Sequence, residues 1–133
     1  MSESMNRDNR QRAVLQWVSD TFGEPATAVE ERVLRVLEEA VELAQAEGVT
    51  RDRARSVVDY VFSKPPGDPS QEVGGLGVTL LAYCEASGLL ADTEEQHEFD
   101  RVIAMDPTLF RARHNKKADA GIAVRAAEPG DKR

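Results

Sequence analysis

The sequence predicts a single all-α domain over residues 1–133, and three observations lead to this fold class. The chain has 133 residues, of which 41% are hydrophobic and 31% charged, a composition typical of one globular domain. Aromatic residues make up only 5%, so the core must consist mostly of Leu, Val and Ala, which suits helices better than a β-sandwich. Apolar residues also recur at helical spacing along most of the chain. We therefore expect a four-helix bundle with short extra helices.

The first predicted helix covers residues 12–22, whose apolar side chains recur at intervals of three and four residues. Gly23 and Pro25 follow this segment and are expected to end the helix. The polar residues before it, 1–10, are expected to form a loose tail outside the core.

The second predicted helix, from Ala28 to the residue before Gly48, has the strongest signal in the chain. Thr27 and Glu30 have the spacing of a capping box, in which each side chain bonds the other residue's backbone N–H. Apolar residues at every third or fourth position then form one stripe along the helix. Gly48 is expected to stop the helix.

Two more helices are predicted on either side of a proline-rich loop. Thr50 is expected to cap a helix over residues 51–62, with its valines facing inward. Asp68 is expected to cap a fourth helix that closes at Gly88; a strand over 78–83 is the alternative. Three glycines in the first half of this helix would each cost about 1 kcal/mol relative to alanine, so they indicate close packing or room for a ligand. These glycines are Gly74, Gly75 and Gly77.

The last third of the chain contains two shorter predicted helices. Asp92 and Glu95 have the spacing of a capping box and are expected to open the first of them. Asp106 and Pro107 then form an N-cap and first helical position for the second. Residues 124–133 are expected to form a loose C-terminal tail.

The charge and the absence of targeting signals limit the function classes. The net charge of −7 argues against binding to a nucleic acid polymer or an anionic membrane. Residues 1–11 are too polar for a signal peptide, and no apolar run reaches the 18 or so residues that span a membrane. Cys84 is the single cysteine and is expected to be a small buried hydrophobic residue. We therefore expect a cytoplasmic protein.

Several glutamates lie close together on the second predicted helix. Glu39 and Glu42 are three residues apart, and Glu38 and Glu42 are four apart, so each pair shares one side of the helix and repels. They flank the apolar stripe, where carboxylates need compensation, and a divalent cation such as Mg²⁺ supplies it. Glu72 would face them if the fourth helix packs antiparallel to the second. The alternative is a solvated acidic face, because Glu-x-x-Glu is frequent by chance.

The surroundings of these glutamates resemble a known family. The segment ERVLRVLEEAVEL (residues 31–43) resembles the first motif of the MazG-like all-α nucleoside triphosphate pyrophosphatases. In that family a second helix carries Glu-x-x-Asp, and QEVGGL (residues 71–76) stands at that place, with Gly75 where the Asp is expected. Small phage-type members look most similar, also over VVDYV (residues 57–61). The resemblance covers about residues 16–123.

The resemblance implies a reaction and a metal site. Water would attack the α-phosphorus of a nucleoside triphosphate and release the monophosphate and pyrophosphate, with Mg²⁺, or Mn²⁺, as cofactor. Glu38 and Glu39 are the expected catalytic residues, Glu38 as a further ligand or a general base. Gly75 leaves open whether one or two ions bind, and whether Asp59 or a water replaces the missing ligand. The expected metal ligands are Glu38, Glu39, Glu42 and Glu72.

The resemblance also points to substrate contacts. It suggests that a basic C-terminal stretch with Arg113, Lys116 and Lys117 closes over the triphosphate, often from a neighbouring subunit; the alternative is a solvated helix end. Trp17 could stack on the base, although a single Trp is more often a core anchor. Asn115 could contact a base edge or a phosphate.

The resemblance leaves three functions open. A purine deoxynucleotide such as dGTP or dATP is the expected substrate of a small phage-type enzyme, which would act in the host cytoplasm. A phosphoribosyl-ATP pyrophosphohydrolase and a catalytically silent nucleotide-binding module are the alternatives. Because so thin a helical unit leaves apolar surface to cover, we expect a homodimer or a homotetramer.

Overall fold

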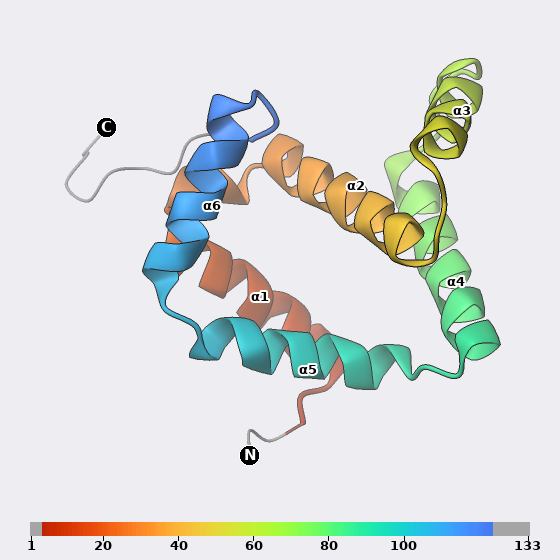
Figure 1. Ribbon diagram of the computed structural model, residues 1–133. Coiled ribbons are helices and arrows are strands. Elements are labelled where there is room, and N and C mark those ends of the chain that lie inside the picture. The colour runs from red at the N-terminus through yellow and green to blue at the C-terminus, as the bar shows by residue number, and fades with distance from the viewer. Residues whose placement is uncertain (1–3, 124–133) are drawn as a thin grey trace. The chain divides into compact units, whose positions relative to one another are not determined.

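The computed structural model describes residues 4–123 (Figure 1). Within this range the chain forms six α-helices and one short 3₁₀ helix and contains no strand, which confirms the all-α prediction. The predicted C-terminal tail, 124–133, lies outside the described residues. The elements are α1 (Arg7–Phe22), η1 (Glu24–Thr27), α2 (Val29–Ala46), α3 (Arg51–Phe62), α4 (Pro69–Ser87), α5 (Ala91–Ala104) and α6 (Pro107–Asp119).

The chain divides into two compact units. The first, which we call the terminal unit, comprises Met1–Val36 and Asp92–Arg133, and the second, the central unit, comprises Leu37–Ala91. Helix α2 contributes its N-terminal half to the terminal unit and its C-terminal half to the central unit.

The core of the terminal unit lies where α1, η1 and α6 meet. Val18, Phe22 and Ala26 are buried there, and Trp17 and Phe110 pack against them. The Trp17 ring meets Phe22 and Phe110 edge-to-face, with centroids 5.7 and 5.2 Å apart, an arrangement that aromatic pairs prefer. Trp17 is therefore a core anchor of this unit, in agreement with the more conservative of its two interpretations.

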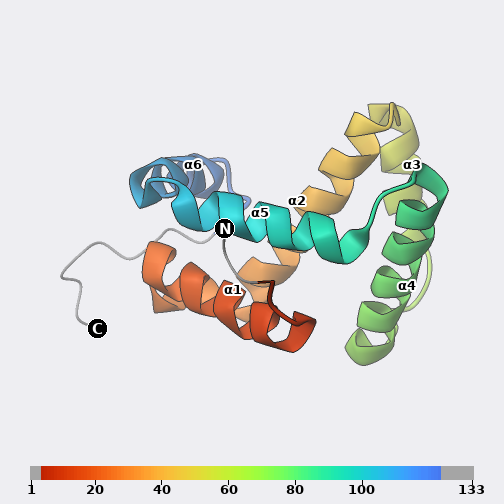
Figure 2. The same ribbon diagram turned by 90° about the horizontal axis from the view of Figure 1, so that it is seen from below.

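The start of α1 differs from the predicted loose tail. The helix begins at Arg7, because the side chain of Asn6 caps it by accepting a hydrogen bond from a backbone N–H three residues later. Arg10 is only 3% exposed, and its guanidinium donates hydrogen bonds of 2.6 Å to Asp92 and Glu95 of α5, which lies beside α1 (Figure 2). The prediction was wrong for residues 7–10, since α5 supplies partners that the local sequence does not show.

Two predicted capping boxes do not form. Thr27 ends the 3₁₀ helix η1, where its hydroxyl donates a hydrogen bond of 2.7 Å to the carbonyl of Glu24, and α2 begins only at Val29. Asp92 lies inside the first turn of α5, which begins at Ala91, and its carboxylate bonds Arg10 instead. In both cases another partner occupies the side chain that local spacing assigned to a cap.

The helices of the central unit agree with the predicted ones. Helix α3 has the predicted limits, and Thr50 caps it by accepting a hydrogen bond from the N–H of Arg53. Asp68 caps α4 in the same way, and α4 runs unbroken through 78–83, so the strand alternative was wrong. Gly88 ends α4 with a φ of 73°, in the left-handed region that glycine adopts readily. In the described part of the chain, no single helix is long and apolar enough to cross a membrane.

The central unit buries little of its apolar surface. Over residues 37–91, all of which the structure describes, Cys84 is the only buried residue; its burial was predicted. The valines of α3 were expected to face inward, but Val57 and Val61 are 58% and 52% exposed. A Cβ added at any of the three α4 glycines would meet nothing within 4 Å, so the chain itself does not pack closely against them. The apolar faces of this unit therefore remain open.

Candidate functional site

The predicted metal ligands all belong to the central unit. Glu38, Glu39 and Glu42 lie in the C-terminal half of α2, and Glu72 lies in the first turn of α4. Helix α2 is continuous through this region, so Glu38 and Glu42 are one turn apart on the same side, as expected. Four carboxylates are thus supplied by two helices of one unit.

The single chain does not assemble these carboxylates into a metal site. Among residues 4–123, no three His, Cys, Asp or Glu side chains lie close enough together to hold a metal ion. The placement of Glu72 opposite α2 therefore stays a prediction, and so does the number of bound ions.

Glu72 lies in the first turn of α4, and its exposed side chain reaches the space next to Gly67. A side chain at Gly67 would collide with Oε1 of Glu72, so the glycine leaves the space that this carboxylate occupies. The carboxylate lies near the N-terminal end of the helix, where the exposed backbone N–H groups favour negative charge. Gly67 is a residue that the sequence analysis missed, although it directly precedes the recognised cap Asp68.

The predicted phosphate-binding residues belong to the terminal unit. Arg113 and Lys116 are exposed on α6, and Lys117 is half-buried. Their neighbour Asn115 buries its Oδ1, which accepts no hydrogen bond within the described residues. Because this oxygen is covered by the protein itself, it is not open to a ligand as it stands, and the contact of Asn115 with a base edge or a phosphate stays a prediction.

Charged residues from the first motif form a buried group in the terminal unit. The side chain of Glu31 is fully buried, and its Oε1 lies 3.3 Å from Nε of Arg35 and 3.7 Å from Nδ1 of His114. Arg32 lies 3.8 Å from the same oxygen and donates a hydrogen bond to the carbonyl of Ala26. Burial lowers the pKa of Arg32, and the charge of Glu31 opposes this effect. The sequence analysis did not predict that these residues are buried together. The four-residue spacing of Glu31 and Arg35 could have indicated an ion pair.

Comparison with protein-family models, with curated proteins and with solved structures finds no match for this chain.

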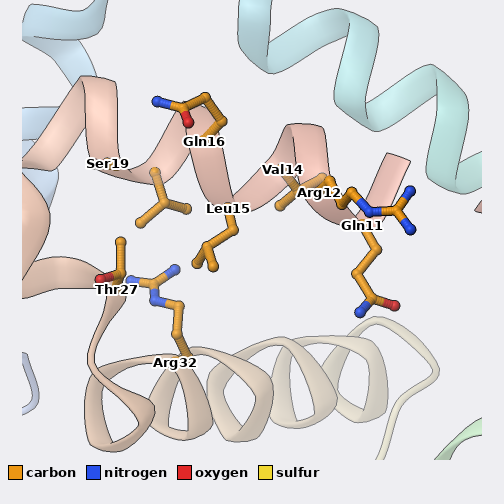
Figure 3. Close-up of a pocket in the computed structure, with 9 residues that line it drawn as sticks. Gln11, Arg12, Val14, Leu15, Gln16, Ser19, Thr27 and Arg32 are labelled. Atoms are coloured by element: carbon orange, nitrogen blue, oxygen red, sulfur yellow. The ribbon is translucent and has the colours of Figure 1, made fainter. Parts of the chain in front are cut away.

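A groove separates α1 from the start of α2 in the terminal unit (Figure 3). It encloses about 600 Å³, a size typical of small-molecule sites. Figure 3 shows Leu15 pointing from α1 into this space, while Thr27 and Arg32 lie at one end. Val14 and Val18 add to its apolar wall. The groove is open to solvent, and its chemistry suits an apolar group more than a triphosphate.

The donor groups of the two units differ in what they can bind. The carboxylates on α2 and α4 suit a hard divalent cation, since such ions prefer oxygen ligands. The exposed cations of α6 suit phosphate oxygens, to which Arg and Lys donate charge-assisted hydrogen bonds. A nucleoside triphosphate with bound Mg²⁺ is a ligand that uses both kinds of group.

Proposed function

We propose that this chain is a metal-dependent nucleotide pyrophosphohydrolase of the MazG-like kind, which converts a (deoxy)nucleoside triphosphate to the monophosphate and pyrophosphate. One observation carries the proposal: Glu38, Glu39 and Glu42 fall within little more than one turn of an unbroken helix, next to apolar surface that the chain leaves open. Carboxylates that are this close together on a helix can bind one divalent cation through several oxygens. Purine deoxynucleotides are the proposed substrates.

The proposed roles of the residues follow from their donor chemistry. Bound Mg²⁺ would neutralise charge on the phosphate oxygens and lower the pKa of the attacking water. Glu39, Glu42 and Glu72 would hold the ion, and Glu38 would hold a second ion or accept the proton of the water. The phosphate-binding residues would be Arg113, Lys116 and Lys117, with Asn115 directed at the base or a phosphate.

A second copy of the chain is part of the proposal. Helices of 12 to 19 residues, as in α3 and α4, are marginally stable in water unless their apolar faces pack against something. The central unit leaves those faces exposed, so we propose that a homodimer or homotetramer covers them and completes a MazG-like four-helix bundle. The proposed assembly acts in the cytoplasm, or in the host cytoplasm if the chain is encoded by a phage.

The decisive experiment measures pyrophosphate release from a panel of eight NTPs and dNTPs with Mg²⁺ or Mn²⁺. We expect release from a few nucleotides, and we expect Glu42→Gln to abolish it. Glu30→Gln is the matched control, because Glu30 is exposed on the first turn of the same helix and should leave the rate unchanged. No release from any nucleotide with either metal would overturn the proposal.

A catalytically silent nucleotide-binding module is the second candidate, and Gly75 favours it because the family motif has a metal ligand at that position. The two candidates differ in their response to Gly75→Asp. An added side chain at Gly75 meets nothing within 4 Å, so Asp can be accommodated within the chain. A silent module would bind nucleotide with Mg²⁺, seen as a rise in Tm, and would release pyrophosphate only after this substitution. If phosphoribosyl-ATP alone is cleaved, the chain is a phosphoribosyl-ATP pyrophosphohydrolase.

A further inference from the structure

The fully buried carboxylate of Glu31 lies between α2 and α6 of the terminal unit. Nε of Arg35, one turn later on α2, lies 3.3 Å from Oε1 of Glu31, and Nδ1 of His114 on α6 lies 3.7 Å from the same oxygen. The ring of Phe22, at the end of α1, lies against the His114 ring with a centroid distance of 5.1 Å. Burying a carboxylate is costly unless cations and hydrogen-bond donors surround it. The position of α6 is thus tied to the charge on Glu31.

Arg35 adds a second connection between α2 and the residues that follow α6. Its guanidinium donates a hydrogen bond to the backbone carbonyl of Ile122, while its Nε faces Glu31. Glu31 and Arg35 therefore join α2 to α6 at His114 and again beyond the end of α6. Two connections at separate points fix the orientation of a helix, whereas a single one would let it pivot.

The helix that Glu31 contacts also carries the predicted phosphate-binding cations. Arg113, Lys116 and Lys117 lie close to His114 along α6. A change in the orientation of α6 would therefore move these cations as well.

We propose that Glu31 is a positioning residue, which holds α6 in a fixed orientation on the start of α2 and so keeps the α6 cations placed to bind phosphate. This inference rests on the proposed function. An apolar side chain of similar volume often replaces a buried ion pair without loss of stability, so stability alone does not account for charge at this position. The need to hold a substrate-binding helix in a fixed orientation does account for a charge at this position, because misplaced cations weaken substrate binding.

The test compares Glu31→Gln with the wild type and with Glu30→Gln, its exposed neighbour, at temperatures well below each Tm. We expect the KM for the best dNTP to rise roughly tenfold with kcat changed by less than about threefold, as for a residue that acts on substrate binding. Hydrogen exchange without nucleotide should show faster exchange of the α6 backbone amides in Glu31→Gln and unchanged exchange in Glu30→Gln. A purely structural role would lower Tm but leave KM unchanged in the folded protein.

His114→Gln removes the α6 partner of Glu31 and provides a second variant in case Glu31→Gln does not fold. We expect the same rise in KM and the same faster exchange in α6. An unchanged KM together with unchanged exchange in the folded variants would overturn the inference. If the wild type releases no pyrophosphate, the proposed function fails, and the exchange of α6 alone then decides whether Glu31 positions this helix.

Discussion

Arg10 of α1 donates a hydrogen bond of 2.6 Å to Asp92, near the start of α5, across most of the length of the chain. The guanidinium also bonds Glu95, and these two hydrogen bonds raise the pKa of Arg10. Arg10 is buried, whereas Asp92 is largely exposed. The carboxylate of Asp92 therefore keeps contact with water, while the buried guanidinium needs its hydrogen bonds to the two carboxylates. This contact orders the start of α1 and connects it to α5.

Arg10→Met is expected to destabilise the terminal unit by about 2 kcal/mol, the usual contribution of hydrogen bonds to a charged group. Arg12→Met is the control, because Arg12 is exposed on the same helix and bonds only the nearby side chain of Asn9 among the contacts described. Surface changes of this kind usually alter the free energy of unfolding by less than about 0.5 kcal/mol. Urea unfolding followed by the fluorescence of Trp17 measures both; equal effects of the two variants would contradict the prediction.

Asp106 gives the stability of α6 a dependence on low pH. Its carboxylate accepts a hydrogen bond of 2.9 Å from the backbone N–H of Thr108, which lowers the pKa of Asp106 in the folded protein. The folded pKa lies below the unfolded one, so the ionised carboxylate stabilises α6 above the unfolded pKa. This contribution is lost as the pH falls through the folded pKa, in a window below about pH 4.

Asp106→Asn is the variant that isolates this effect, because Asn keeps a capping oxygen but does not titrate. We expect the difference in Tm between wild type and variant to shrink as the pH is lowered from neutrality to about 3. Glu98, whose pKa is lowered by its hydrogen bonds to Arg101, is present in both proteins and cancels in the difference. A Tm difference that does not change with pH would show that Asp106 does not act through its charge.

The elements that sequence reasoning located correctly have local signals. Thr50 and Asp68 cap α3 and α4 because the backbone groups they bond are three residues away. Thr27 and Asp92 have similar spacing but find other partners, and local spacing does not reveal the competition. Glu31 was missed as a buried residue for the same reason: its partner His114 comes from a distant part of the chain. Local chemistry thus predicts helices well, whereas the burial of charge depends on long-range contacts.

In the predicted site, too, some features follow from local helix geometry and others depend on long-range packing. The spacing of Glu38 and Glu42 on one side of α2 follows from helix geometry alone and is confirmed. Whether Glu72 faces them depends on how helices pack, which the spacing along the chain does not determine. Trp17 could have stacked on a base or packed in the core, and only its contacts with Phe22 and Phe110 favour the core.

Gly67→Ala is expected to displace the carboxylate of Glu72, because the added methyl group would occupy the same space. If Glu72 is a metal ligand, as proposed, the Mg²⁺ concentration for half-maximal pyrophosphate release should rise, because the end of this flexible side chain has to move aside. Pro66→Ala changes the adjacent exposed residue of the same loop and should leave the Mg²⁺ dependence unaltered. An identical Mg²⁺ dependence in wild type and Gly67→Ala would argue against Glu72 as a ligand.

Val57→Glu tests whether a second copy covers the central unit. Val57 is 58% exposed on α3, and neighbouring apolar residues of this helix are also open, so a carboxylate there would be desolvated in an interface but harmless on a free surface. We expect the wild type to sediment as a dimer or tetramer and Val57→Glu to dissociate at concentrations at least tenfold higher, a loss of about 1.4 kcal/mol or more. Ser56→Glu is the matched control, because it adds the same charge at the preceding residue, which is also exposed. This variant should keep the wild-type assembly. Analytical ultracentrifugation over a range of concentrations measures all three. A monomeric wild type would contradict the proposed assembly, and equal weakening by both variants would show that the added charge, rather than the covered valine, controls association.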